Sequence, residues 1–162
     1  MSVRTDTITA TETQATGHRC TVLLVEDEAE LMDVLRVALE ADGYDVAQAS
    51  NGREALRQLR STAMTCLIIL DLQLPVMDGR RFRSVQLRDR SLAWIPVVVV
   101  SSGLEAVGEA RELGARAFVR KPIDVDQLRE TVRRISCPQS RARPEHRGRR
   151  ANANDDTRSR RW

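Results

Sequence analysis

Four short apolar runs in this chain each lead directly into residues that can take part in metal or phosphate chemistry. The runs at 22–25, 67–70, 97–100 and 117–120 are followed by Glu26 with Asp27, by Asp71, by Ser101 and by Lys121. Apolar runs without polar alternation are typical of strands buried on both faces of a parallel sheet. Because all strands of such a sheet point the same way, their C-terminal residues gather along one edge, where ligands bind. The sequence therefore predicts a crevice that holds three carboxylates, a hydroxyl and an ammonium group.

Lys121 stands out because it is the only lysine among the 26 basic residues of the chain. Arginine carries a planar, forked guanidinium, whereas lysine carries a compact charge on a flexible stem. A single lysine at the end of a predicted strand, followed by Pro122, indicates a position where a guanidinium does not fit.

Between the apolar runs, the pattern changes to helical spacing, so that strands and helices alternate. Strands are expected at about 21–25, 44–49, 66–70, 96–100 and 117–120, and helices at about 28–41, 53–61, 79–88, 104–112 and 124–135. Gly43 is expected to end the first helix, and Asn51-Gly52 to form a turn before the second. Five strand–helix units with right-handed crossovers predict an α/β fold with a doubly wound, five-stranded parallel sheet and five helices.

Composition divides the chain into three parts. Residues 1–19 lack a periodic apolar pattern and are expected to be a disordered leader, 20–136 form the folded domain, and 137–162 form an arginine-rich disordered tail. The tail carries eight arginines and three acids, a charge of +5, so the remainder carries −2 of the total of +3. No second folded output domain is expected after residue 136.

Cysteine usage and hydropathy indicate the compartment. Cys20, Cys66 and Cys137 are odd in number and far apart in sequence, and they are expected to be reduced thiols. The chain has no apolar signal core, and no run approaches the roughly 18 apolar residues of a membrane span. A soluble, cytoplasmic protein without membrane insertion is therefore expected.

The predicted carboxylates suit a metal ion. Glu26, Asp27 and Asp71 would repel one another in one crevice unless a cation joined them, and hard oxygen ligands suit Mg²⁺. The alternative is that Glu26 and Asp27 only cap the first helix, a role for which one acid suffices. A carboxylate fixed at a strand end beside Mg²⁺ can attack a phosphoryl group and form an acyl phosphate, with Asp71 as the candidate.

In order and spacing, the segments LLVEDE, LDLQLPVMDG, VVVVSSG and FVRKP of residues 20–136 resemble a bacterial response-regulator receiver domain of the stand-alone type. The resemblance implies a flavodoxin-like sheet of strand order 2-1-3-4-5. It also implies roles for individual residues: Asp71 as phosphoacceptor, Asp27 and Asp71 as metal ligands, the backbone carbonyl of Gln73 as a further ligand, Glu26 as a ligand through water, Lys121 as the phosphate-pairing lysine, Ser101 and Phe118 as switch residues, and Pro122 as the proline that commonly follows a cis peptide bond.

The resemblance further implies a phosphoacceptor in a two-component or phosphorelay pathway rather than an enzyme, with chemistry limited to self-phosphorylation from a phosphodonor and auto-dephosphorylation. Its expected partners are a sensor histidine kinase or histidine phosphotransfer protein and a downstream protein target. An aspartyl-nucleophile phosphatase is disfavoured because that class has an acid two residues after the nucleophile, where this chain has Gln73.

Several other readings stay open. Phe118 is either a switch residue or simple core packing. The domain is either an active phosphoacceptor or a phosphorylation-independent interaction module. The basic tail can bind nucleic acid through phosphates, although an inert tail is favoured because it lacks interleaved aromatic residues. The segment from Ser101 to Gly114 is about two residues shorter than the corresponding segment of most receiver domains, the family that the chain resembles.

Overall fold

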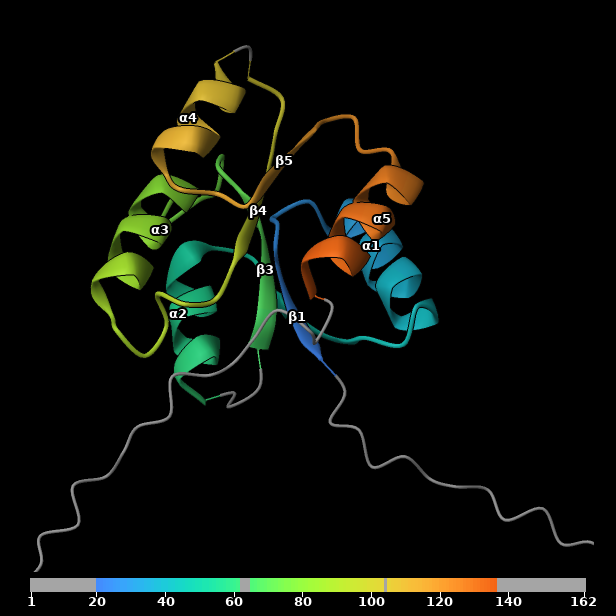
Figure 1. Cartoon of the computed structure of the whole chain (residues 1–162), viewed down its shortest axis with the longest axis horizontal. Helices are drawn as coiled ribbons and strands as arrows, with labels where there is room; N and C mark the ends of the chain where they lie inside the picture. Colours follow the sequence, from blue (N-terminus) through green and yellow to red (C-terminus); the bar gives the residue numbers. More distant parts are fainter. Residues whose placement is uncertain (1–19, 62–64, 104, 137–162) are drawn as a thin grey trace, which may run out of the picture.

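A computed structural model describes residues 20–61, 65–103 and 105–136 of the chain (Figure 1). The predicted leader, 1–19, and the predicted tail, 137–162, lie outside the described residues. Within the described ranges, none of the helices has the length and apolar character that crossing a membrane requires.

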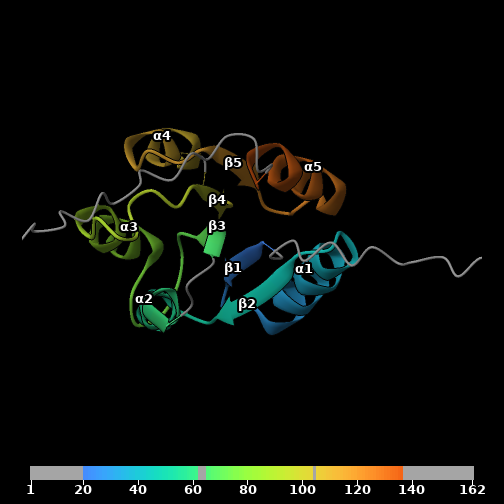
Figure 2. The ribbon, with the colours of Figure 1, turned by 60° about the horizontal axis from the view of Figure 1, so that its bottom comes forward.

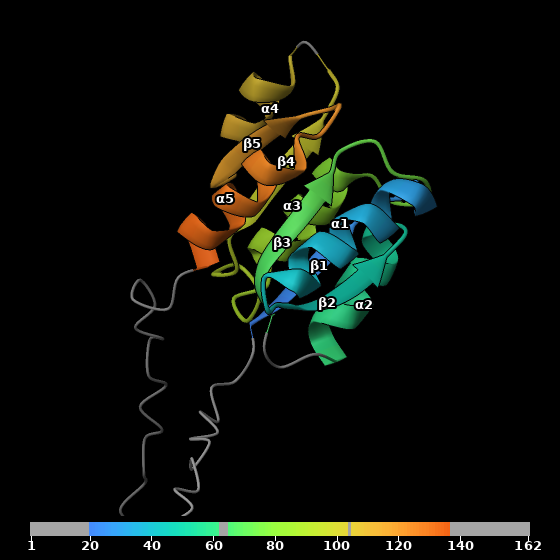
Figure 3. The same ribbon diagram turned by 90° about the vertical axis from the view of Figure 1, so that its right-hand side faces the viewer.

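Five strands and five helices alternate along the chain, as the sequence pattern predicts. In chain order they are β1 (Thr21–Val25), α1 (Ala29–Ala41), β2 (Asp45–Ala49), α2 (Gly52–Ser61), β3 (Thr65–Asp71), α3 (Gly79–Arg88), β4 (Val97–Ser101), α4 (Ala106–Glu112), β5 (Ala117–Arg120) and α5 (Val125–Ser136). The strands form one parallel sheet of order β2-β1-β3-β4-β5 (Figure 3). This is the flavodoxin-like α/β fold, and the expected topology is confirmed.

The sheet lies between two layers of helices (Figures 1 and 2). Helices α1 and α5 cover one face, and α2, α3 and α4 cover the other. Successive strand residues contribute to opposite faces, so Leu23 and Ile68 join the core beneath α2 and α3, whereas Val22 and Leu67 join the core beneath α1 and α5. The central strands are buried on both sides, which is why their sequences are continuously apolar.

Two helix starts differ from the expected ones because polar side chains cap them. Asn51 is not part of a free turn: its side-chain oxygen accepts a hydrogen bond of 3.0 Å from the backbone N–H of Glu54, so α2 begins at Gly52. Asp124 similarly accepts hydrogen bonds from two backbone N–H groups of the first turn of α5. Gly43 follows α1 with a φ of 89°, as expected for a residue that ends a helix.

The fourth helix starts later than expected. The sequence pattern predicts a helix from about 104, whereas α4 begins at Ala106 and spans 7 residues. Glu105 precedes it in a helical backbone conformation and its side chain makes no capping hydrogen bond. The N–H of Ala106 instead donates to the carbonyl of Gly103 over 3.3 Å, so the first turn of this short helix is held by the backbone rather than by a side-chain cap.

The expectation of reduced thiols is wrong for two of the three cysteines. Cys20 and Cys66 form a disulfide with a Cα–Cα distance of 5.7 Å. The residues are 46 positions apart in sequence. Because β1 and β3 are neighbours in the sheet, with Thr21 opposite Thr65, Cys20 just before β1 and Cys66 at the start of β3 come close together. Cys137 lies outside the described residues.

Candidate functional site

The residues predicted to share a crevice all lie at the C-terminal edge of the sheet. Glu26 and Asp27 directly follow β1, Asp71 ends β3, Ser101 ends β4, and Lys121 directly follows β5. Because these strands are parallel and in register, with Asp71 opposite Val100 and Ser101 opposite Arg120, their ends lie at the same level. The structure therefore brings these residues to the same edge of the sheet.

Three carboxylates meet at the centre of this site. One oxygen each of Glu26, Asp27 and Asp71 lies within 4.8 Å of the others. Glu26 and Asp71 are buried, with 2% and 4% of their surface exposed, whereas Asp27 is exposed. Such a set of oxygen donors, two held by the sheet and one open to solvent, can hold a hard divalent cation that keeps some of its water.

Lys121 links two of these carboxylates. Its Nζ lies 2.6 Å from Oδ2 of Asp71 and 2.9 Å from Oε2 of Glu26. Burial alone would lower the pKa of Lys121, but the hydrogen bonds to Asp71 and Glu26 outweigh it, and the pKa is raised. The lysine is therefore held in its charged form. The backbone N–H of Lys121 also donates to the carbonyl of Ser101, which ties the start of the β5–α5 segment to β4.

Burying the carboxylate of Glu26 beside Asp71 is energetically unfavourable. Burial raises the pKa of Glu26, although the hydrogen bond from Lys121 and one of 3.2 Å from the backbone N–H of Glu28 act to lower it. The lysine therefore does not fully compensate the buried charge.

Asp71 is positioned by the backbone as well as by the lysine. The N–H of Gln73 donates to Oδ1 of Asp71 over 2.9 Å, while Oδ2 faces Lys121. Behind it, α3 begins against the strand end: the N–H of Gly79 donates to the carbonyl of Leu72. Both carboxylate oxygens of Asp71 thus have fixed directions.

Ser101 and Phe118, the two predicted switch residues, come from neighbouring strands. Ser101 is 3% exposed, and its Oγ accepts a hydrogen bond of 3.4 Å from the backbone N–H of Gly103. Phe118 is partly buried and packs against the core beneath α2 and α3. This position fits both core packing and a switching role.

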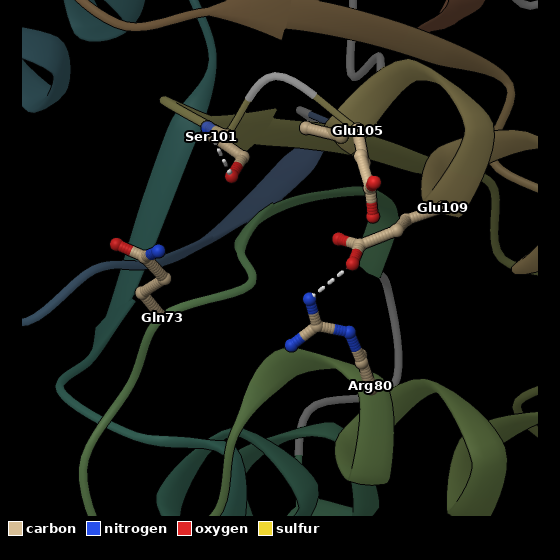
Figure 4. Close-up of a pocket in the computed structure, with 7 residues that line it drawn as sticks. Gln73, Arg80, Ser101, Glu105 and Glu109 are labelled. Atoms are coloured by element: carbon tan, nitrogen blue, oxygen red, sulfur yellow. Dashed lines mark hydrogen bonds and ion pairs between the residues drawn. The ribbon is translucent and has the colours of Figure 1, made fainter.

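A pocket of about 380 Å³ opens beside Ser101 (Figure 4). It is lined by Gln73, Arg80, Ser101, Gly103, Glu105, Ala106 and Glu109. Arg80, in the first turn of α3, forms an ion pair of 2.5 Å with Glu109 of α4 across this pocket. Arg80, Glu105 and Glu109 are not predicted from the sequence, because no local pattern shows that residues 29 positions apart will pair.

The fold, the acidic cluster and its paired lysine together define the receiver class of two-component signalling domains. The chain belongs to the response regulator receiver domain family, whose pattern matches residues 22–133. Receiver domains are signalling modules rather than enzymes, in agreement with the sequence-based expectation.

Two curated relatives and one solved structure illustrate the likeness. Sporulation initiation phosphotransferase F of Bacillus subtilis is 29% identical over 114 residues, covering 70% of this chain and 90% of that protein. The polar-differentiation response regulator DivK of Brucella anthropi is 34% identical over 114 residues, covering 69% and 92%. The receiver domain of the sensor histidine kinase PA1611 from Pseudomonas aeruginosa, solved with a magnesium ion in its active-site cleft, shares the fold with a TM-score of 0.67 at 23% identity, covering 73% of this chain and 98% of that one.

Proposed function

We propose that this domain is a Mg²⁺-dependent phosphoacceptor in which Asp71 receives a phosphoryl group from a histidine kinase or a histidine phosphotransfer protein. The observation that carries the proposal is the placement of Asp71. Its carboxylate is fixed at a strand end, contacts Lys121 at 2.6 Å, and lies within 4.8 Å of two further acids.

In the proposed reaction an oxygen of Asp71 attacks the phosphorus of the donor's phosphohistidine. The new O–P bond forms as the P–N bond breaks, and the imidazole leaves with the bonding electron pair. Phosphoryl transfer of this kind depends on in-line positioning and on neutralising the charge of the equatorial oxygens. The hydrogen bond from the Gln73 N–H and the contact with Lys121 orient the attacking carboxylate.

The donor set fits magnesium, which when bound would neutralise phosphoryl oxygens at this edge. Asp27 and Asp71 are the proposed direct ligands, with Glu26 acting through water and the backbone carbonyl of Gln73 completing the protein's share. Asp27 is exposed and thus open to a hydrated ion, whereas Glu26 is engaged by Lys121. The receiver domain of PA1611, which has the same fold, holds a magnesium ion in its active-site cleft, and this supports magnesium as the ion.

Lys121 and Ser101 would then bind phosphoryl oxygens, the first as a charge partner and the second as a hydrogen-bond donor. Ser101 is available for this role because its Oγ accepts only a long hydrogen bond of 3.4 Å among the described contacts. As Ser101 moves inward, the ring of Phe118 on the adjacent strand would follow. The change would switch a surface that a downstream protein target recognises.

The proposed setting is the cytoplasm, where histidine kinases present their phosphorylated domains. Two other functions are kept as alternatives: a receiver-like interaction module that needs no phosphorylation, and nucleic-acid binding through the basic tail. The first is disfavoured by the assembled set of acids and lysine. The second depends on residues 137–162, outside the described structure.

The proposal is tested by intact-mass spectrometry after incubation with acetyl phosphate and Mg²⁺. We expect a gain of one phosphoryl group that disappears on chelation of the metal and in Asp71→Asn. The matched control is Asp33→Asn, an identical change at an exposed position of α1, which should be phosphorylated like the wild type. A folded wild type that gains no mass would support the phosphorylation-independent alternative instead.

A further inference from the structure

Arg80 and Arg83 both reach from α3 to α4, but their contacts differ in kind. Arg83 is 5% exposed, and it donates to the carbonyls of Leu113 and Gly114 at the end of α4, over 2.9 and 3.0 Å. Arg80, one turn earlier, has a side chain that is 51% exposed and pairs with Glu109 in the middle of α4. The end of α4 is thus anchored by a buried contact, while its middle is held by an exposed one.

The exposed ion pair between Arg80 and Glu109 is easier to break than the buried hydrogen bonds of Arg83. Ion pairs open to solvent contribute little to stability, because water competes for both partners and two long side chains must be ordered. A buried guanidinium whose hydrogen bonds are satisfied is costly to release, because its charge would lose its partners. A new negative charge near α4 would therefore draw Arg80 away from Glu109 before it drew Arg83 away from its carbonyl partners.

The site described above would supply that charge. Arg80 lines the same pocket as Ser101 and Gln73 (Figure 4), the hydroxyl and the loop residue beside Asp71. Lys121, the cation in contact with Asp71, is already shared with Glu26. A phosphoryl group on Asp71 adds negative charge at this edge, and a forked guanidinium matches phosphate oxygens well.

The acidic residues of the pocket would also favour breaking of the ion pair between Arg80 and Glu109. Glu105 and Glu109 face the space that Arg80 faces, and their carboxylates would be repelled by a phosphoryl group on that side. Attraction of Arg80 and repulsion of Glu109 both oppose the ion pair that joins them. The helix it restrains has 7 residues and contains Gly108, so it is too short to be stable by itself.

We propose that Arg80 is an additional phosphoryl-binding residue, and that its transfer from Glu109 to the phosphoryl group on Asp71 frees the N-terminal part of α4. The helix then moves about its end, which Arg83 holds in place. This inference rests on the proposed function, because it requires a phosphoryl group on Asp71.

The test measures two properties of the full-length protein, with and without acetyl phosphate and Mg²⁺: the lifetime of the acyl phosphate and amide hydrogen exchange of the segment 105–112. The variants are Arg80→Ala and Glu109→Gln. The matched control is Arg81→Ala, which removes the neighbouring exposed arginine, whose side chain makes none of the described hydrogen bonds or ion pairs.

In the wild type, phosphorylation should speed exchange in this segment by about two- to fivefold, the range that loss of an exposed ion pair allows. Both variants should exchange at the faster rate before phosphorylation. Arg80→Ala should also shorten the acyl-phosphate lifetime by about threefold or more, because a charge-assisted hydrogen bond is lost, whereas Glu109→Gln should retain or lengthen it. Arg81→Ala should match the wild type in both properties.

Two results overturn the inference and are distinguishable. If the wild type is phosphorylated but Arg80→Ala matches Arg81→Ala in lifetime and exchange, the role of Arg80 is refuted and the proposed function stands. If the wild type is folded and takes up no phosphoryl group, both fail together.

Discussion

Replacing Gly79 with alanine is expected to destabilise the domain strongly, because α3 starts in direct contact with the end of β3. A Cβ added at Gly79 would lie 2.3 Å from the backbone oxygen of Asp71 and 2.8 Å from Cα of Leu72. Ordinary contacts to a Cβ are at least about 3.4 Å, so one of the two backbones has to shift by roughly 1 Å. The two clashing atoms of Asp71 and Leu72 belong to the main chain, so they cannot move aside as the end of a flexible side chain would.

Overpacking of a well-packed core costs about 1–3 kcal/mol, and the upper end is expected here because Leu70 and Leu72, on either side of Asp71, are at most 1% exposed. The chain also offers the same substitution without the clash. A Cβ at Gly108 in α4 meets nothing within 4 Å, so Gly108→Ala should stabilise the helix by about 0.5–1 kcal/mol through its higher helix propensity.

The two variants should therefore differ by about 3–4 kcal/mol in free energy of unfolding. Urea denaturation followed by circular dichroism measures this difference, with the wild type between the two variants. Because the clash falls on the backbone of Asp71, Gly79→Ala should also slow phosphorylation by acetyl phosphate. A Gly79→Ala protein within about 0.5 kcal/mol of the wild type, the usual range for neutral surface changes, would refute the reasoning.

Three further predictions concern charged and covalent contacts. Lys121→Met leaves the two buried carboxylates without their cation and should lower the free energy of unfolding by about 3–5 kcal/mol, a loss that added Mg²⁺ partly reverses in urea denaturation by binding the folded state. The hydrogen bonds from Arg129 lower the pKa of Asp42 from 3.8 to about 2, so this pair stabilises the fold above pH 3.8 and ceases to do so as the pH falls through about 2. Asp42→Asn should accordingly cost about 1–2 kcal/mol at pH 7, discounted for the partial exposure of Arg129, and a difference that does not shrink in denaturation series toward pH 2 would contradict this. Cys66→Ser opens a loop of 46 residues and should cost up to about 4 kcal/mol; adding a thiol reductant to the wild type should have the same effect and leave the variant unchanged.

The strands and the central site residues could be predicted because their signals are local. A run such as Leu67–Leu70 identifies a doubly buried strand by itself, and Asp71 is then placed by being the next residue. Parallel order brings the other strand ends to the same edge without any knowledge of long-range pairing. The acids and Lys121 were therefore found from strand ends alone.

Contacts between distant segments could not be predicted in the same way. Nothing around Arg80 distinguishes it from Arg81 in the sequence, yet the first faces Glu109 and the second makes no such pair. Cys20 and Cys66 were separated in sequence, and their proximity depends on the register of β1 with β3. The start of α2 depended on whether the side chain of Asn51 turned back to Glu54, one of several conformations open to an asparagine.

The edge that carries the site includes Glu26, a buried acid whose ionised form opposes folding. A folded-state pKa above the ordinary value means that folding disfavours the ionised form of Glu26, so at neutral pH this residue opposes folding. Lys121 reduces that cost but is shared with Asp71, the proposed nucleophile. A fully compensated site would be more stable, but it would leave no unbalanced negative charge to attract a divalent cation. The proposed chemistry therefore requires that one lysine neutralise Glu26, Asp27 and Asp71 only in part. Burial of the apolar strands that carry these residues offsets the resulting loss of stability.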